Sequence, residues 1–162
     1  MRRNDREITN RQEIYGVLKS CDVLRIRMNS PDFPYIIPMN FGTETEGQSL
    51  ILWLHCAPEG LKLSLINKDN RVSFEADRLH KLISSDKACN FTMEYESVIG
   101  CGYAKICNDK ADKRRGLQSI MRHYAPDKSF SFTDDELSAV CVLRINVMQI
   151  TGKRLSSITK LT

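Results

Sequence analysis

The chain has 162 residues, of which 41% are hydrophobic and 27% charged, and this is enough for one globular domain with its own core. No apolar run approaches the roughly 20 residues of a membrane-spanning helix, and no apolar stretch follows the first arginines as in a secretory signal. The net charge of +4 arises from Lys and Arg residues interspersed with Asp and Glu, which gives little support for nucleic-acid binding. We therefore expect a single cytoplasmic domain over residues 1–162, without a membrane or nucleic-acid partner.

The six cysteines are scattered singly, without the Cys-x-x-Cys spacing of a zinc site. They are Cys21, Cys56, Cys89, Cys101, Cys107 and Cys141. We interpret them as reduced, buried or incidental thiols and predict neither a metal site nor a disulfide framework. Cys56 directly follows His55, but strand alternation would point the two side chains to opposite faces, which argues against a Cys–His nucleophilic pair.

The first half of the chain predicts one helix and three antiparallel strands. Asn10 precedes a segment with helical apolar spacing at 11–19, and Glu13 follows it in the pattern of a capping box. Apolar residues then alternate in three segments separated by turn residues. These strands are predicted over 22–28, 35–41 and 49–55, with a polar turn over 43–48.

The second half predicts further helices and strands. The helices are expected over 60–68, over 109–124 and from Thr133 onward, and the strands over 71–77, 91–106 and 140–150. Residues 78–89 mix polar and apolar side chains, and we expect an irregular loop or a turn of helix there. Gly100-Cys-Gly102 is a composition typical of a β-bulge. Many short strands with a few outer helices indicate a compact antiparallel barrel of the α+β class.

The segment 53–77 has the layout of a small-ligand site. An apolar strand delivers His55 into a Pro-Glu-Gly turn, and a helix follows with Gly60 at its start and Lys62 in its first turn. Free backbone N–H groups and an ammonium can converge there on one anion, for which a phosphate is the natural guest. His55 adds an imidazole that titrates near neutral pH. A solvated surface lysine and a structural histidine are the alternative interpretations.

Pro38 lies inside an otherwise apolar strand, although a proline cannot donate to a strand ladder. The backbone at this point is therefore expected at a sheet edge or turned toward a ligand.

A set of ordered motifs covers nearly the whole chain and resembles one known family. The motifs are the opening residues 3–8, YIIPMNFG at 35–42, LHCAPEGLKLSLI at 54–66, NRVSFEAD at 70–77, YESVIGCGYAKI at 95–106, KRRGLQSIMRHY at 113–124 and ITGK at 150–153. In this order they resemble the FMN-binding split barrels of the pyridoxamine 5'-phosphate oxidase-like superfamily. Within it they are most similar to the nitroimidazole-resistance (Nim) flavoproteins.

The resemblance implies an α+β fold, a six-stranded antiparallel split β-barrel with peripheral helices. It also implies a homodimer with two FMN sites at the subunit interface. The residues that match flavin-contacting positions are Ile36, Ile37, Pro38, Met39 and Asn40 along the isoalloxazine edge, His55 and Lys62 near the flavin and its phosphate, Ser97 and Val98 for a further phosphate or ring contact, and His123 and Tyr124 toward the partner's site.

The first functional hypothesis is an FMN-dependent oxidoreductase that reduces a small electron-poor molecule such as a nitroimidazole or a quinone. His55 would be its catalytic residue, positioning or protonating the substrate. The alternative is a flavin- or haem-binding carrier or sensor without turnover, and a basic RNA-binding barrel ranks far below both. The electron donor, and whether deazaflavin or haem replaces FMN, are left open. Residues 144–162 lack the arginine and histidine that hold pyridoxal phosphate in vitamin-oxidising members, so we do not expect pyridoxamine phosphate oxidation.

Overall fold

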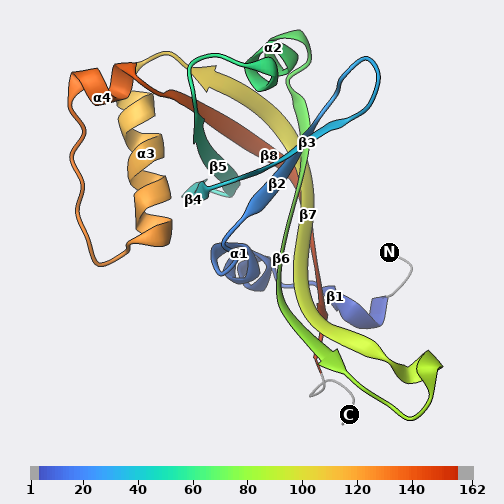
Figure 1. Ribbon diagram of the computed structural model, residues 1–162. Helices are drawn as coiled ribbons and strands as arrows, with labels where there is room; N and C mark the ends of the chain where they lie inside the picture. The colour runs from blue at the N-terminus through green and yellow to red at the C-terminus, as the bar shows by residue number, and fades with distance from the viewer. Residues whose placement is uncertain (1–3, 157–162) are drawn as a thin grey trace.

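The structure is a computed structural model that describes residues 4–156. Residues 1–3 and 157–162 lie outside the described part, and with them Arg3 of the opening motif and the end of the segment 144–162. Within the described part, all strand pairs are antiparallel and form one curved sheet in the order β3-β2-β6-β7-β8-β5-β4, while β1 pairs with β8 (Figure 1).

The strands and helices have the following bounds in chain order. The strands are β1 Glu7–Ile8, β2 Leu24–Met28, β3 Tyr35–Met39, β4 Phe41–Glu46, β5 Ser49–Cys56, β6 Arg71–Ile83, β7 Thr92–Cys107 and β8 Cys141–Leu155. The helices are α1 Arg11–Lys19, α2 Leu61–Lys68, α3 Lys110–Tyr124 and α4 Asp134–Ser138, with 3-10 turns η1 Asn4–Arg6 and η2 Ala88–Asn90.

The α+β split-barrel class predicted from the sequence is confirmed. The sheet is not closed, and the described residues contain eight strands where the resemblance implied six. The two additions are the two-residue β1 and the strand β4, which lies in the segment predicted as strand 35–41 and polar turn 43–48.

The polar strand β4 was misread as a turn because its charged residues are held by partners distant in sequence. Glu44 Oε2 accepts from Trp53 Nε1 at 2.9 Å and from Arg115 Nε at 2.8 Å. Glu46 pairs with Arg115 at 2.6 Å and with Arg144 at 2.9 Å. These contacts join β4 to α3 and β8, and they cannot be predicted from the local sequence of β4.

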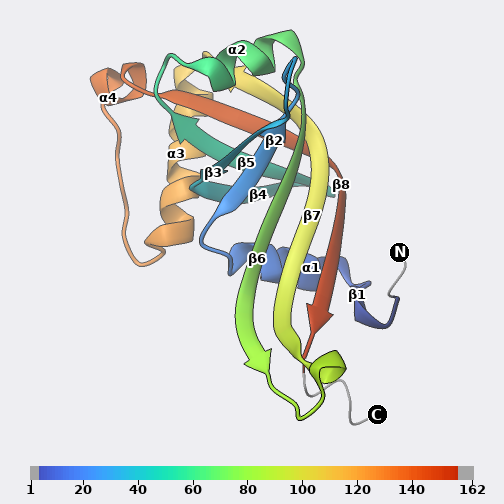
Figure 2. The same cartoon turned by 45° about the vertical axis from the view of Figure 1, so that its right-hand side comes forward.

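The prediction of an irregular segment over 78–89 is wrong for its first half. β6 continues to Ile83 and pairs with β7 in a long hairpin that extends beyond the barrel (Figure 2). The alternation of polar and apolar residues along β6 is interrupted because the register with β7 shifts between Arg78 and Lys81. Leu79, within this shift, has a φ of 61°. The hairpin leaves the core, so its apolar residues are exposed and no longer follow an inside–outside pattern.

The helix ends follow the capping residues of the sequence. The side chain of Asn10 accepts from the N–H groups of Gln12 and Glu13 at the start of α1, and Asp109 caps α3 in the same way. A reciprocal capping box between Thr133 and Glu136 opens α4.

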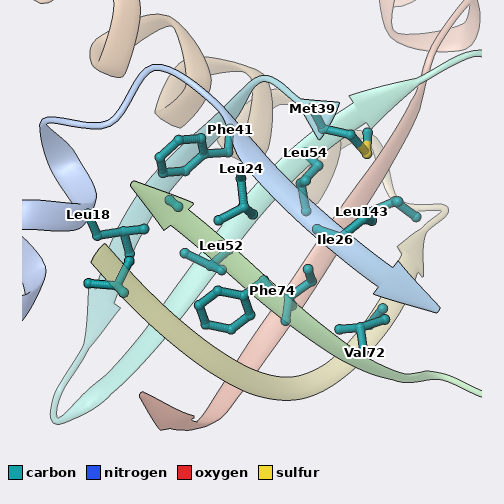
Figure 3. Packing of buried hydrophobic residues seen from close by; sticks show 14 of the residues in the cluster. Leu18, Leu24, Ile26, Met39, Phe41, Leu52, Leu54, Val72, Phe74 and Leu143 are labelled. Atoms are coloured by element: carbon teal, nitrogen blue, oxygen red, sulfur yellow. The ribbon is translucent and has the colours of Figure 1, made fainter. Parts of the chain in front are cut away.

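The core lies inside the barrel, and a second apolar cluster lies under α3. Figure 3 shows the interior packing, in which Leu24, Leu52 and Phe74 meet from different strands. Ile51 and Trp53 point to the opposite face of β5 and pack under α3. β5 is therefore buried on both faces, which explains its unbroken apolar sequence.

Candidate functional site

One end of the barrel brings together three of the predicted site segments. Phe41 pairs with Leu54 in the β4–β5 ladder, so the next residues outward, Asn40 and His55, lie at the same end of these strands. β5 then leads through a short turn into α2, which carries Lys62. The structure thus places the end of β3, His55 and the start of α2 in one region.

The N-terminus of α2 is open. Gly60 is its N-cap, has a φ of 137° and offers no side-chain acceptor to the first helical N–H groups. A Cβ at Gly60 would meet no atom within 4 Å, so no neighbouring group packs against this residue on that side. Lys62 is half-buried in the first turn. This donor set, backbone N–H groups with one ammonium, fits a phosphate dianion.

His55 projects outward at the end of β5. Within residues 4–156 its imidazole has no hydrogen bond and no ion pair, and its side chain is exposed. Both ring nitrogens are therefore available to a ligand.

The strand β3 lies at the sheet edge, as predicted for Pro38. It pairs with β2 on one side, and its other backbone edge has no strand partner in the described sheet. The side chains of Ile36 and Pro38 are exposed, whereas Met39 is buried in the core and Ile37 packs against it. The outward backbone groups of this edge can hydrogen-bond a planar ring.

A row of outward-facing residues runs from this edge across the sheet. Successive partners in the ladders are Ile36, Arg27, Ser73, Cys101 and Gln149. The last four line a hollow of about 530 Å³ on the outer face of the sheet, named here the outer-face hollow. The β3 edge therefore borders this hollow.

The outer-face hollow is lined by cationic and apolar side chains that sequence reasoning missed. Arg71 lies 2.7 Å from Asp69 and holds the pKa of that carboxyl well below its usual range. Tyr103 and Met148 add exposed apolar surface. The only sequence signal near the hollow was the predicted bulge at 100–102, which the register shift between Cys101 and Gly102 confirms.

A charged group lies in the next row, beside Pro38. Arg25 pairs with Pro38 in one ladder and with Glu75 in the other, and its guanidinium contacts Glu75 at 3.1 Å and Asp77 at 2.6 Å. Burial, together with the nearby Asp77 carboxylate, raises the pKa of Glu75. Burial opposes ionisation of Asp77 as well, but the hydrogen bonds and charges of Arg25 and His80 together outweigh it and lower the pKa of Asp77. The pair therefore titrates in two separated steps.

Ser97 and Val98 do not meet His55 within one chain. His55 pairs with Val142 in the β5–β8 ladder. Val142 in turn pairs with Cys107, the last residue of β7. At about 3.4 Å per residue, Ser97 lies on the order of 30 Å along β7 from Cys107. Ser97 faces outward beside Asp77, while Val98 is fully buried in the core and offers a ligand only its backbone.

His123 and Tyr124 end α3 and bind backbone of their own chain. His123 Nε2 lies 2.9 Å from the backbone oxygen of Cys21, and its ring packs on Phe41. The hydroxyl of Tyr124 donates to the backbone oxygen of Asp22 at 2.7 Å and accepts from the N–H of Phe41 at 3.1 Å. These contacts fasten α3 to the turn after α1 and to β4.

The split-barrel sheet with an open edge strand and an anion-receptive helix start defines a class of cofactor-binding barrels. The sequence profile of the pyridoxamine 5'-phosphate oxidase family matches residues 10–154, and the chain belongs to this family. Among solved structures, it is similar to a candidate 5-nitroimidazole antibiotic resistance protein from Bacteroides thetaiotaomicron. The identity is 32% and the TM-score 0.79, over 91% of this chain and 85% of that chain.

Two more distant structures share the fold alone. The FAD and heme binding protein from Mycobacterium smegmatis is 16% identical, with a TM-score of 0.80 over 94% of this chain and 74% of that one. The flavocytochrome Anf3 from Azotobacter vinelandii is 17% identical, with a TM-score of 0.78 over 93% and 70%. No curated protein sequence matches this chain significantly. In the described residues, no helix is long and apolar enough to cross a membrane.

Proposed function

We propose that this chain is an FMN-binding oxidoreductase that acts as a homodimer on a small electron-poor substrate such as a nitroimidazole or a quinone. The observation that carries the proposal is the open N-terminus of α2 with Lys62 in its first turn, next to an unpaired sheet edge at β3. A phosphate and a planar ring need these two elements side by side. The 32% identity to the resistance protein supports the choice of substrate class.

The residues present fit the proposed cofactor. Lys62 and the first N–H groups of α2 would hold the phosphate, and the backbone of Ile37–Asn40 would hydrogen-bond the ring edge. Pro38 interrupts the donors along this edge, which leaves carbonyl oxygens to accept from a ring N–H.

The outer face of the sheet supports a dimer. Ile36, Ile99 and Met148 are 62%, 56% and 64% exposed on β3, β7 and β8. Exposed apolar groups gathered on one face are typical of an interaction surface. Within one chain, Ser97 lies far along β7 from the level of His55, so a two-fold partner laid on this face would be the source of the Ser97 contact.

When bound, the flavin would supply the hydride, and the chain would supply binding and proton control. His55, exposed and free of other contacts in the described part, would orient the substrate and deliver a proton to it.

The test is the visible spectrum of the purified protein, titrated with FMN and separately with haem. We expect flavin bands at about one FMN per chain, reduction of the bound flavin by NADH or NADPH without oxygen, and reoxidation by a nitroimidazole or a quinone. A flavin that binds but is not reoxidised by any acceptor would contradict the oxidoreductase function. Absence of FMN binding would contradict the cofactor as well.

A second candidate is a haem- or flavin-binding carrier or sensor, and the uncommitted ring of His55 favours it. A haem iron needs an axial ligand, and an exposed histidine without other partners can provide one. The other described histidines are engaged, His80 with Asp77 and His123 with Cys21. Under this function, haem would give a Soret band that His55→Ala abolishes, whereas His80→Ala would leave it unchanged.

A further inference from the structure

Two cysteines far apart in sequence face each other across the β5–β8 ladder. Cys56 is the last residue of β5, Cys141 is the first of β8, and they are direct partners in the antiparallel register. Direct partners project to the same face of a sheet. Both side chains lie against the barrel core, with Cys141 buried and Cys56 half-buried.

The spacing of such a pair suits a covalent bond. Directly opposite residues in antiparallel strands have Cα atoms about 4.5 to 5.5 Å apart. Disulfides join residues whose Cα atoms are about 4.4 to 6.8 Å apart. The two backbones would therefore need little movement. The Cys56 thiol is close enough to Cys141 to contribute to the raised pKa of the Cys141 thiol.

Both thiols can be reached from outside the barrel. Cys56 is half-buried, and Cys141 lines a hollow of about 420 Å³ between α2, α3 and α4, together with Cys107 and Lys113. Lys113 Nζ is anchored on the backbone oxygens of Leu137 and Val140 at 2.8 Å each, so a fixed positive charge lies in the wall. The positive charge of Lys113 favours an anionic disulfide compound near this hollow.

We propose that Cys56 and Cys141 form a reversible disulfide in exchange with a low-molecular-weight disulfide such as oxidised glutathione. The more exposed Cys56 thiolate attacks one sulfur of the oxidant and releases one glutathione thiol. Cys141 then loses its proton and attacks the Cys56 sulfur of the mixed disulfide, releasing the second glutathione. Two protein thiols are oxidised and one glutathione disulfide is reduced to two thiols, so atoms and electrons balance.

The order of the two steps follows from the surroundings of Cys141. Burial, with the neighbouring Cys56 adding to it, raises the pKa of the Cys141 thiol to about 11. Lys113 opposes this effect and Cys107 adds to it. The Cys141 thiol therefore stays protonated at neutral pH, and the first attack falls to Cys56.

The consequence of the bond would be local. It would clamp the end of β5 to the start of β8, immediately before the turn that leads into α2. The proposal does not depend on flavin binding, and its test uses no cofactor.

The experiment is incubation of the full chain with oxidised glutathione, followed by thiol counting and peptide mapping without reductant. We expect Cys56 and Cys141 to be lost together as one cross-linked peptide pair, and dithiothreitol to restore both. The cross-linked chain should also melt at a higher temperature, because the bond constrains the unfolded state. A stable mixed disulfide at Cys56, no reaction at either residue, or a cross-link through Cys107 would each overturn the proposal.

Two matched variants test the order of the steps. Cys141→Ala should accumulate glutathione on Cys56, whereas Cys56→Ala should leave Cys141 unmodified at neutral pH. Cys89→Ala removes an exposed cysteine from η2 and should leave the cross-link unchanged. Fluorescence of the buried Trp53 shows whether each variant is folded. The peptide map of the unsubstituted chain tests for the cross-link even if a variant fails to fold.

Discussion

His123 Nε2 lies 2.9 Å from the backbone oxygen of Cys21, and this contact joins the last turn of α3 to the turn between α1 and β2. The adjacent Tyr124 makes a parallel contact with Asp22. Two consecutive residues thus hold the end of a helix against a segment about a hundred residues earlier in the chain.

Acid should weaken the fold partly through His123. Burial lowers the pKa of His123 below its ordinary 6.5, although Cys21 and Asp22 oppose this, so the unfolded chain binds the proton more tightly. The stability linked to the neutral ring is therefore complete above pH 6.5 and is lost as the pH falls through the folded-state pKa. We expect the urea midpoint, followed by Trp53 fluorescence, to fall between about pH 7.5 and about pH 5. His123→Gln should reduce this fall, and an equal fall in both proteins would refute the assignment.

Tyr124→Phe should destabilise the protein by about 1 kcal/mol. The variant loses the hydroxyl that donates to Asp22 and accepts from Phe41, while the ring keeps its packing. The measurement is chemical denaturation at neutral pH. The pH dependence assigned to His123 should be unchanged in this variant, which separates the two contacts.

Gly42→Ala should destabilise the fold by about 1 to 3 kcal/mol. A Cβ at Gly42 would lie 2.5 Å from the backbone nitrogen of Ile120, so α3 would have to move away from β4. Gly16→Ala is the matched control, because a Cβ in the middle of α1 meets nothing within 4 Å. It should stabilise the protein by about 0.5 to 1 kcal/mol, since alanine favours helix more than glycine does. Thermal melts of the two variants should therefore shift in opposite directions.

Lys62→Ala should weaken FMN binding roughly ten- to a hundredfold, as expected for loss of a charge-assisted hydrogen bond to phosphate. Lys68→Ala, at the other end of the same helix, should leave the affinity unchanged. Equal affinities of the two variants would remove Lys62 from the proposed phosphate site.

Mixed dimers would test whether Ser97 serves the partner's site. Under the proposed arrangement, a dimer of one Lys62→Ala chain and one Ser97→Ala chain has one doubly altered site and one unaltered site. Half of the FMN should then bind with the original affinity. Two singly altered sites, neither with the original affinity, would show that Lys62 and Ser97 act in the same chain's site.

Most of the fold could be predicted because the apolar spacing and the capping residues that determine most helices and strands lie within or next to those elements. The predicted helix over 11–19 matches α1, and the apolar spacing over 109–124 gives α3 to within one residue. Asn10 and Asp109 carry the capping side chains that fix where these helices begin. Errors arose where distant partners decide the structure, as for Glu44 in β4 and for the hairpin around Leu79.

The candidate site was less accessible from the sequence. Motif order pointed to His55, Lys62 and the β3 edge, which the structure brings to one region. The position of Ser97, far along β7, depends on the register of a long curved strand and has no local signature. The pairing of Cys56 with Cys141 has the same origin, because only the ladder between β5 and β8 reveals it.

β3 and β4 are the two ends of the sheet path, yet only Asn40 separates them in the chain. This single-residue link keeps the sheet curved, because it prevents the two outermost strands from moving apart. A circularly permuted chain that begins at residue 41 and ends at residue 39 would keep every strand ladder but would no longer hold β3 beside β4. Asn40 therefore sets the curvature of the barrel as well as connecting two strands.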